Sequence, residues 1–176
     1  MKWETKSSKV IYKNRYMTVT EDVVMTGHGD QVTYGIVHKQ PFSIIIPWDG
    51  TRMLLVGQHR HFIKYFSWEF PMGHAESDAP DFAAKRELEE ETGLSARAIN
   101  EIAQFYPAPG TMDQVGYIYV ATDWTEGRME RELSEKDMQM KWVTLEEMNN
   151  LIKDGVIKDG PTIVSLKYFE MYLLTH

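Results

Sequence analysis

Short apolar runs separated by turn residues make up the first part of the chain and predict strands. Over residues 1–40 the runs are rich in β-branched and aromatic residues, and Gly27–Asp30 supplies turn residues between two of them, which predicts a small antiparallel layer. Two further apolar runs, Ser43–Pro47 and Met53–Val56, flank Trp48–Thr51, a segment typical of a hairpin turn. The chain therefore begins as β-structure.

The clearest helical pattern lies at residues 79–92. It combines Pro80 in the first turn with Gly93 after the last turn, which predicts a helix with defined ends. Thr144–Glu147 has capping-box spacing for a short helix, and a last helix is expected over residues 161–174. The other expected elements are strands over 98–105, 115–121 and 138–143, with an acidic loop over 123–137. This order predicts an α+β fold in which a mixed sheet lies between helical layers.

Composition narrows the class of protein. The 176 residues fit one domain, or a compact core with a small appendage, and the lack of cysteine excludes a disulfide scaffold, thiol redox chemistry and a cysteine nucleophile. The 26 acidic and 19 basic residues give a net charge of −7, which argues against nonspecific binding to duplex nucleic acid. No apolar run approaches the roughly 18 residues of a membrane span. We therefore expect a cytoplasmic protein with no membrane partner and no stable nucleic-acid partner.

Acidic residues gather on one side of the helix expected at residues 79–92. At about 100° per residue, Glu87 and Glu91 lie about 40° apart, at the border of the buried face that Leu88 marks. Glu90 lies one turn from Glu87. Like charges four positions apart cost roughly 0.2–0.5 kcal/mol on an exposed helix, and more where water is excluded. A hard divalent cation would turn this repulsion into coordination, and ligands that offer only oxygen favour Mg²⁺ or Mn²⁺; the alternative is a solvated glutamate-rich face.

Arg86 precedes these acids. It lies four residues before Glu90, so the two side chains can pair. Arginine on the N-terminal side of glutamate is the weaker orientation for a surface helix pair. This favours a role for Arg86 in orienting the Glu90 carboxylate over a role in solubility alone.

Gly73–Asp78, seven further residues and Arg86–Leu94 together resemble the signature of the Nudix hydrolases. That signature reads glycine, five residues, glutamate, seven residues, then Arg-Glu-apolar-x-Glu-Glu-x-Gly-apolar, and Arg86–Leu94 matches its second half position by position. The first half departs from the signature, because Asp78 stands where glutamate is usual and Gly73 lies one residue too close. Glu76 can substitute for the missing acid, so the first acidic position stays open between Asp78 and Glu76.

Motifs outside the signature are similar to those of the ADP-ribose and nucleoside diphosphate sugar pyrophosphatases. They comprise the β-rich N-terminal segment, Gln58-x-Arg60, Trp68–Gly73, Tyr106–Gly110 and Lys153–Thr162, and they cover nearly the whole chain. The resemblance implies the Nudix fold, a mixed β-sheet sandwiched between helices, with an extra N-terminal antiparallel β layer. It also implies that residues 1–40 form a β subdomain that helps to build a homodimer, and that residues 41–176 form the Nudix hydrolase domain. The alternative for residues 1–40 is additional sheet within a monomer.

The resemblance further implies the residues of a metal site. Glu87, Glu90 and Glu91, together with the backbone carbonyl of Met72, would hold Mg²⁺, with Mn²⁺ as the alternative ion. Arg86 and Glu90 would also act in catalysis. Helical spacing brings the three glutamates together, and the resemblance adds the Met72 carbonyl as a fourth ligand.

A general base is expected from the acidic loop after the signature. The candidates are Glu130, Glu132, Glu135 and Asp137. We favour Glu135 together with Asp137, because Glu135-x-Asp137 lies just before the strand expected at residues 138–143. The sequence alone does not choose among the four.

Substrate contacts are expected from residues outside the helix. The planar guanidinium of Arg60 suits paired phosphate oxygens, and Glu69 would either reach the substrate or pair with Arg60. Trp68, Phe70 or Tyr106 would stack on a nucleobase, and Gly110 would contact substrate from the loop that contains Tyr106. The alternatives are surface solvation for Arg60 and core packing for the three aromatic residues.

Together these features imply metal-dependent hydrolysis of the pyrophosphate bond of a nucleoside diphosphate sugar, such as ADP-ribose or GDP-mannose. The products would be a nucleoside monophosphate and a sugar phosphate. An alternative is a nucleoside triphosphate or RNA 5′-end pyrophosphohydrolase, which the acidic charge and the long N-terminal sheet disfavour. A further alternative is a non-catalytic nucleotide-binding regulator with the Nudix fold. Such modules typically lose a helix carboxylate, whereas Glu87, Glu90 and Glu91 are all present here.

Overall fold

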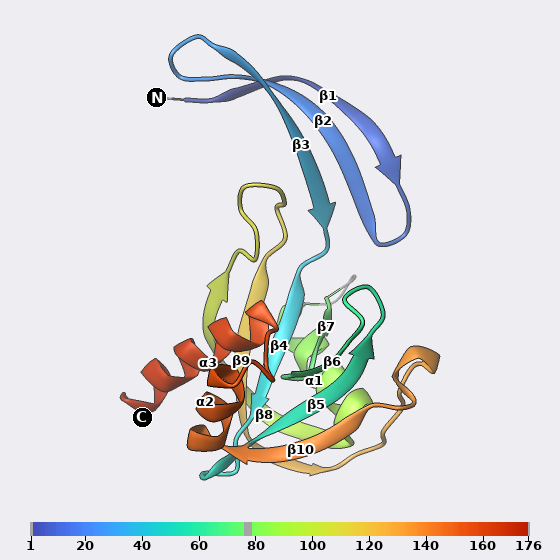
Figure 1. Ribbon diagram of the computed structural model, residues 1–176, viewed down its shortest axis with the longest axis vertical. Coiled ribbons are helices and arrows are strands. Elements are labelled where there is room, and N and C mark those ends of the chain that lie inside the picture. The colour runs from blue at the N-terminus through green and yellow to red at the C-terminus, as the bar shows by residue number, and fades with distance from the viewer. Residues whose placement is uncertain (1, 76–78, 176) are drawn as a thin grey trace. The chain divides into compact units, whose positions relative to one another are not determined.

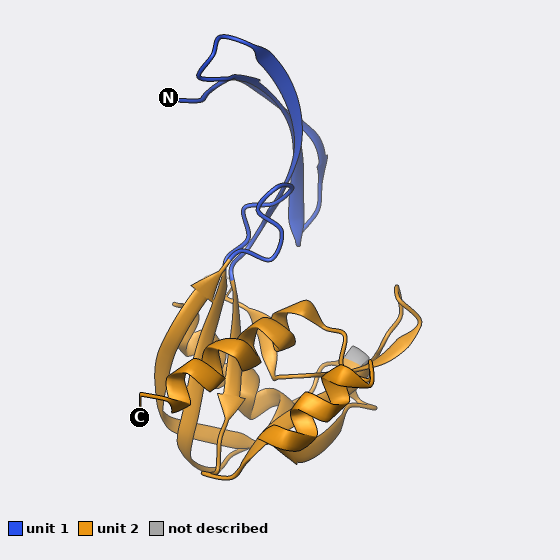
Figure 2. Ribbon diagram, turned by 60° about the vertical axis from the view of Figure 1, so that its left-hand side comes forward, with its two compact units in different colours: residues 1–41, 106–115 blue, residues 42–105, 116–176 orange. Residues whose placement is uncertain are grey.

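The computed structural model describes residues 2–75 and 79–175, and they form two compact units (Figure 2). Unit 1 comprises residues 1–41 and 106–115, and unit 2 comprises residues 42–105 and 116–176. Unit 1 is therefore assembled from two separate stretches of sequence. Glu76 and Asp78, the two candidates for the first acidic position, lie outside the described residues.

Unit 1 contains a three-stranded antiparallel sheet in the order β1-β2-β3 (Figure 1). Its strands are β1 (Glu4–Lys13), β2 (Met17–Met25) and β3 (Gln31–Lys39). All ten residues of β1 are exposed, and its register with β2 shifts at two places. Residues 106–115 lie against β3, where the Val37 amide donates to the Thr111 carbonyl at 2.8 Å. The expected N-terminal antiparallel layer is thus confirmed.

Unit 2 contains two sheets, and the larger one is mixed (Figure 1). Its strands lie in the order β7-β4-β9-β8, with β4 parallel to β9 and the other pairs antiparallel. The second sheet is antiparallel, in the order β10-β5-β6. The strands are β4 (Phe42–Pro47), β5 (Arg52–Arg60), β6 (Tyr65–Glu69), β7 (Met72–His74), β8 (Leu94–Phe105), β9 (Gly116–Glu126) and β10 (Gln139–Thr144). The helices are α1 (Pro80–Thr92), α2 (Leu145–Lys153), α3 (Gly160–Leu173) and the short 3₁₀ helix η1 (Leu133–Glu135).

The core of unit 2 explains why every residue of β4 is buried. Ile44 and Ile46 lie in one hydrophobic cluster with Phe169 of α3. Ile45 lies in a second cluster with Leu88 of α1, as expected for a strand whose successive side chains point to opposite faces. The mixed sheet therefore lies between α1 and α3, which confirms the predicted layers. No helix in the described part of the chain has the length and apolar character needed to cross a membrane.

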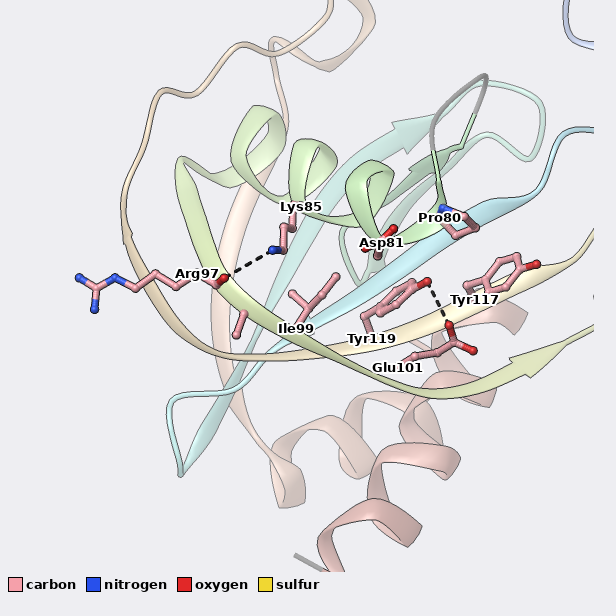
Figure 3. A pocket seen from close by; sticks show the side chains of 9 residues that line it. Pro80, Asp81, Lys85, Arg97, Ile99, Glu101, Tyr117 and Tyr119 are labelled. Carbon is pink, nitrogen blue, oxygen red and sulfur yellow. Dashed lines mark hydrogen bonds between the residues drawn. The ribbon is translucent and has the colours of Figure 1, made fainter.

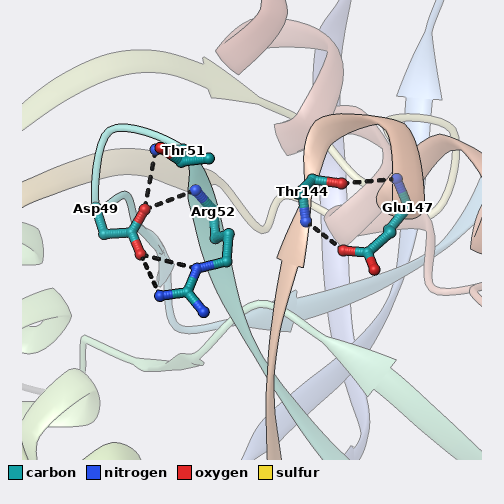
Figure 4. Close-up of polar contacts among 5 residues, drawn as sticks. All are labelled: Asp49, Thr51, Arg52, Thr144 and Glu147. Atoms are coloured by element: carbon teal, nitrogen blue, oxygen red, sulfur yellow. Dashed lines mark hydrogen bonds and ion pairs between the residues drawn. The ribbon is translucent and has the colours of Figure 1, made fainter.

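The structure confirms two short predicted motifs, the turn at Trp48–Thr51 and the capping box at Thr144–Glu147 (Figure 4). In the turn between β4 and β5, Oδ1 of Asp49 accepts hydrogen bonds from the amides of Thr51 and Arg52 at 2.9 and 2.7 Å. The bond from the Arg52 amide is the main reason why the pKa of Asp49 lies below its usual value. At the start of α2, Oγ1 of Thr144 accepts from the Glu147 amide at 3.2 Å, and the Glu147 carboxylate accepts from the Thr144 amide at 2.7 Å. This is the predicted capping box.

Several strand boundaries differ from the sequence expectation. β8 begins at Leu94 instead of residue 98, directly after Gly93 ends α1 with a φ of 74°. β9 continues to Glu126, so the acidic loop starts later than residue 123. No strand was expected where β6 and β7 lie. β6 forms a hairpin with β5, and β7 pairs with the fully buried β4 about thirty positions earlier; strand formation depends on such neighbours more than on local preference.

Candidate active site

The glutamates of α1 differ in burial. Glu91 is 3% exposed, and the side chains of Glu87 and Glu90 are 14% and 37% exposed. Leu88, which lies between them in sequence, is fully buried in the core. The helical spacing therefore places Glu87 and Glu91 beside the core, where most of their hydration is lost.

Burial raises the pKa of both carboxyl groups. Loss of hydration is the largest cause for Glu87 and raises its pKa to about 7; Arg86 opposes the increase, and the charges of Glu90 and Glu135 add to it. Burial also raises the pKa of Glu91 well above its usual value, and the charges of Glu135 and Glu87 add to that increase. Strongly shifted carboxyl groups of this kind gather at functional sites more often than elsewhere.

One oxygen of this group has no partner. Oε2 of Glu91 is buried and has no hydrogen-bond partner among the described residues, which is unfavourable for a carboxylate. With the side chains as they stand, no three His, Asp or Glu residues within 2–75 and 79–175 are close enough together to hold a metal ion. Arg86 instead contacts both Glu87 and Glu90. The all-carboxylate donor set and the unpartnered oxygen fit a hard divalent cation.

Arg86 connects the acidic face of α1 to β7. Its Nη1 lies 3.0 Å from Oε1 of Glu87 and 3.1 Å from Oε2 of Glu90, and its Nη2 donates to the His74 carbonyl at 3.2 Å. The pairing of Arg86 with Glu90 that the spacing predicts is therefore present. Its part in catalysis stays a prediction.

Strand β7 approaches α1 at a glycine. A Cβ atom at Gly73 would overlap the Glu87 carboxylate, so any larger residue here would displace that carboxylate from its present position. Met72 pairs with Ile44 of β4, which fixes the position of the strand. This arrangement holds the backbone of residues 72–73 beside Glu87, and the Met72 carbonyl as a metal ligand stays a prediction.

Arg60 and Glu69 form an ion pair with two hydrogen bonds between β5 and β6. Nε of Arg60 donates to Oε1 of Glu69 at 2.9 Å, and Nη2 donates to Oε2. Of the two roles that the sequence left open for Glu69, pairing with Arg60 is the one that the structure contains. Hydrogen bonding to Glu69 is the main cause that raises the pKa of Arg60, and the charges of Asp159 and Glu91 contribute. The ion pair therefore lies near the carboxylates of α1.

Asp159 is a member of this group that the sequence analysis missed. It caps α3, where its Oδ2 accepts from the Thr162 amide at 2.8 Å. Burial raises its pKa, and the charge of Glu69 adds to the increase. The hydroxyl of Thr162 in turn accepts from the Phe70 amide at 3.1 Å, which connects the start of α3 to the end of β6. Aspartate before Gly160 is a capping signal, but its proximity to Arg60 is a product of the fold.

The acidic loop brings one of its carboxylates close to α1. Glu135 is the last residue of η1, and its side chain accepts from the Glu132 amide at 3.1 Å. Its charge raises the pKa of both Glu87 and Glu91, so its carboxyl group faces the same site. Asp137 lies just beyond η1 and is exposed. The assignment of either residue as general base stays a prediction.

The residues predicted to stack on a nucleobase are divided between the two units. Trp68 in β6 is half-buried, packs against the core cluster, and meets Phe66 edge to face at a centroid distance of 5.5 Å. Tyr106, which is 61% exposed, and Gly110 belong to unit 1. Phe70 is fully buried in the core cluster, so core packing is the role that the structure gives it. Trp68 acts in part as a core residue, and the substrate contacts of Trp68, Tyr106 and Gly110 stay predictions.

A surface cavity of about 590 Å³ lies between the first turns of α1 and strands β8 and β9 (Figure 3). Within it, the Tyr119 hydroxyl donates to Glu101 at 3.2 Å, and the Lys85 ammonium donates to the Arg97 carbonyl at 3.4 Å. None of the predicted site residues lines this cavity. The group formed by the carboxylates of α1, the Arg60–Glu69 pair and Glu135 is therefore separate from it.

Comparisons with known proteins agree with this geometry. Residues 38–165 match the model of the NUDIX domain, and residues 3–37 match that of the nucleoside diphosphate sugar hydrolase N-terminal domain. The chain is 28% identical over 138 residues to an ADP-ribose pyrophosphatase of Bacillus subtilis, covering 77% of this chain and 75% of the relative. It is 30% identical over 168 residues to an ADP-ribose pyrophosphatase of Mycobacterium tuberculosis, covering 93% of this chain and 81% of the relative.

A solved structure supports the fold. The crystal structure of an ADP compounds hydrolase superposes with a TM-score of 0.87 at 18% sequence identity, covering 99% of this chain and 96% of the other. At this identity the likeness establishes the fold alone. With the match of the NUDIX model to most of the sequence, it confirms the Nudix fold with an N-terminal antiparallel sheet. The chain belongs to the Nudix pyrophosphohydrolase family, and to the group within it that carries the nucleoside diphosphate sugar hydrolase N-terminal domain.

Proposed function

We propose that this chain hydrolyses the pyrophosphate bond of a nucleoside diphosphate sugar, such as ADP-ribose or GDP-mannose, in a reaction that depends on Mg²⁺ or Mn²⁺. The products are a nucleoside monophosphate and a sugar phosphate. The observation that carries the proposal is the burial of Glu87 and Glu91, which raises the pKa of both carboxyl groups. In addition, Oε2 of Glu91 has no hydrogen-bond partner among the described residues. The N-terminal domain match supports the class of substrate.

Glu87, Glu90, Glu91 and the Met72 carbonyl would hold the metal. When bound, Mg²⁺ neutralises charge on phosphate oxygens and lowers the pKa of a coordinated water. Arg86 keeps Glu87 and Glu90 together through its two ion pairs. Because these carboxylates do not converge as they stand, metal binding would draw them together from neighbouring positions on α1.

Arg60 would contact a phosphate oxygen of the substrate. Its contacts with Glu69 use Nε and Nη2, so the ion pair fixes the guanidinium plane and leaves Nη1 as a further donor. The side chain is 41% exposed, which keeps that donor accessible. Trp68, Tyr106 and Gly110 would contribute contacts to the nucleoside.

Glu135 would accept the proton of the attacking water, with Asp137 as the alternative. The proximity of Glu135 to Glu87 and Glu91 supports this assignment, because its charge affects the pKa of both. A general base must lie within reach of the water that it activates. Loss of activity in Glu135→Gln with retained activity in Asp137→Asn would support Glu135, and the reverse result would support Asp137.

We further propose that the chain forms a homodimer through the sheet of unit 1. Trp3, which directly precedes β1, and Val10, Ile11 and Tyr12 of β1 are all more than half exposed, and exposed apolar side chains gather at interaction surfaces. Light scattering at several concentrations tests the proposal. A monomer throughout would favour the alternative, in which unit 1 is additional sheet within one chain.

The experiment that tests the activity is a substrate panel with Mg²⁺: ADP-ribose, GDP-mannose, UDP-glucose, dinucleoside polyphosphates, nucleoside triphosphates and triphosphorylated RNA. We expect a nucleoside monophosphate and a sugar phosphate from one of the sugar nucleotides. Release of pyrophosphate from triphosphates or RNA would contradict the proposal. Binding of one ligand without any product would identify a non-catalytic regulator.

A matched pair of variants ties the activity to the buried carboxylate. Glu91→Gln should reduce turnover by about a hundredfold to a thousandfold and leave the fold intact, because it removes a buried charge without changing shape. Glu89→Gln is the control from the same helix: Glu89 accepts a hydrogen bond from the Arg128 amide at 3.2 Å, which glutamine can also accept. Wild-type turnover in Glu91→Gln would refute the assignment of the helix ligands.

A further inference from the structure

Arg131 connects the acidic loop to the end of α1. Its Nε donates to the carbonyl of Glu91, 40 positions earlier in the chain, at 2.9 Å. Its Nη1 donates to the carbonyl of Met138, seven positions later, at 2.6 Å. One partly buried side chain therefore joins the metal-binding end of α1 to the two ends of the segment that contains η1.

The carbonyl groups at the C-terminal end of α1 need hydrogen-bond donors from outside the helix. The last carbonyls of a helix have no donors within the helix and carry partial negative charge, and the last turn of α1 contains no basic residue. The segment after β9 supplies the donors: the Glu130 amide donates to the Glu90 carbonyl at 3.0 Å, and the Gly127 amide donates to the Gly93 carbonyl at 2.8 Å. Arg131 adds the only guanidinium among these contacts. Its charge complements the negative end of the helix.

The second bond of Arg131 closes the loop around Glu135. Met138 is 5% exposed and directly precedes β10, so its carbonyl is a fixed point at the end of the loop. Between the two points, the Met138 amide donates to the Glu135 carbonyl at 2.9 Å, and the Glu135 side chain accepts from the Glu132 amide at 3.1 Å. Every residue that defines the position of Glu135 is thus held within the segment that Arg131 closes.

We propose that Arg131 is a positioning residue: by donating to the carbonyls of Glu91 and Met138, it keeps the Glu135 carboxylate beside the carboxylates of α1. The inference rests on the proposed function, in which Glu135 accepts the proton of the attacking water. Arginine suits the task because its rigid, planar group carries several donors that can serve two acceptors at once, whereas lysine presents a single ammonium on a flexible stem. In this role Arg131 acts through Glu135 and not on the reacting atoms.

The test compares Arg131→Met and Arg131→Lys with Arg128→Met in the full chain. Arg128 is the matched control, because it lies in the same loop but its side chain is 85% exposed and pairs only with Glu130 among the described residues. Without metal, amide hydrogen exchange over residues 131–138 should be about tenfold faster in Arg131→Met. With Mg²⁺ and the preferred substrate, kcat should fall about a hundredfold while KM changes less than about threefold, since a small displacement of a catalytic group has effects of this size. Arg131→Lys should lie between, and Arg128→Met should stay within about twofold of wild type.

Each outcome of this comparison either supports or overturns the positioning role of Arg131. Faster loop exchange together with a loss confined to kcat, and partial rescue by lysine, supports the positioning role. Wild-type exchange over residues 131–138 in Arg131→Met overturns it, and so does wild-type kcat. If Arg131→Met does not fold, the same comparison is made with Arg131→Lys, for which wild-type exchange and kcat overturn the proposal. If the wild-type chain cleaves nothing in the panel, the proposed function fails, and hydrogen exchange still decides whether Arg131 holds the loop.

Discussion

Helices α1 and α2 use glutamate in opposite ways. Glu147 of α2 accepts a hydrogen bond from the Thr144 amide, and this bond is the main reason why its pKa is lowered. Glu87 of α1 is packed beside β7, and burial raises its pKa to about 7. The charged form of the same side chain is therefore favoured at the start of one helix and disfavoured on the other. Both residues are glutamates, so their surroundings decide the difference: a backbone amide next to Glu147 makes it a helix cap, whereas burial makes Glu87 a candidate metal ligand.

The largest expected effect comes from filling the space beside Glu87. Gly73→Ala places a methyl group where the Glu87 carboxylate lies, so the carboxylate must move out of its position, and turnover should fall by about a hundredfold or more. Hydrolysis of the preferred substrate and far-ultraviolet circular dichroism check the loss and the retained fold. Gly35→Ala is the control, because a Cβ atom there meets nothing within 4 Å. Equal turnover in the two variants would show that the close approach at Gly73 is dispensable.

The second prediction concerns pH and the raised pKa of Glu87. Between about pH 4.5 and 7 the folded chain keeps a proton on Glu87 that the unfolded chain has lost, so this group makes stability decrease as pH rises through that window, by on the order of 3 kcal/mol in total. Urea unfolding of wild type and Glu87→Gln across this range measures the effect, and glutamine should remove that part of the slope.

The same urea unfolding measurement, repeated with Mg²⁺, tests whether a metal binds at Glu87. A divalent cation competes with protons for carboxylates, so added Mg²⁺ should stabilise wild type more at pH 8 than at pH 5 and should stabilise Glu87→Gln less than wild type. An equal response of both proteins at both pH values would speak against a metal at these carboxylates.

On α2, the expected effect is on stability alone. Thr144→Ala removes the side chain that accepts from the Glu147 amide, and loss of a cap of this kind reduces the free energy of unfolding by about 1 kcal/mol. Urea unfolding measures the loss, and hydrolysis should stay within about twofold of wild type. A large loss of turnover would mean that α2 contributes to the site.

The smallest expected effect is that of Glu147→Gln. Because the pKa of Glu147 is lowered in the folded chain, its contribution to stability is present above its unfolded pKa and is lost as pH falls through its folded value. Its dependence on pH therefore has the opposite sign to that of Glu87 and lies below about pH 4.5. Unfolding curves between pH 3 and 6 for the variant and wild type would show a slightly weaker acid dependence in the variant; an identical dependence would mean that the hydrogen bond to Thr144 does not shift this group.

The parts of the site that could be predicted are those that depend on local spacing. The helix around Glu87 and Glu91, the pairing of Arg86 with Glu90, and the capping box at Thr144 all involve residues within one or two turns of each other. Helical geometry fixes such neighbours without knowledge of the rest of the chain. The order of the elements likewise predicted the mixed sheet between helices.

The parts that could not be predicted are those that depend on long-range packing. The sequence offered the pair of Arg60 and Glu69 only as one of two roles for Glu69, because β6, whose pairing with β5 brings the two side chains together, was not expected. Asp159 joins them only because the start of α3 is bound to Phe70 at the end of β6. Arg131 reaches the end of α1 across 40 positions. None of these contacts leaves a periodic pattern in the sequence, since each depends on which strands become neighbours.

Strand β1 has a consequence for how unit 1 can meet another protein. It lies at an edge of its sheet, where unpaired backbone groups invite a foreign strand. The two irregularities in its register disturb the regular spacing of those groups, and Lys6, Lys9 and Lys13 add repulsive charge along it. An approaching chain therefore cannot easily extend the sheet by hydrogen bonding. Association through the broad side of the sheet, by contact between side chains, does not depend on those backbone groups, so the irregular edge favours that mode over the addition of strand to strand.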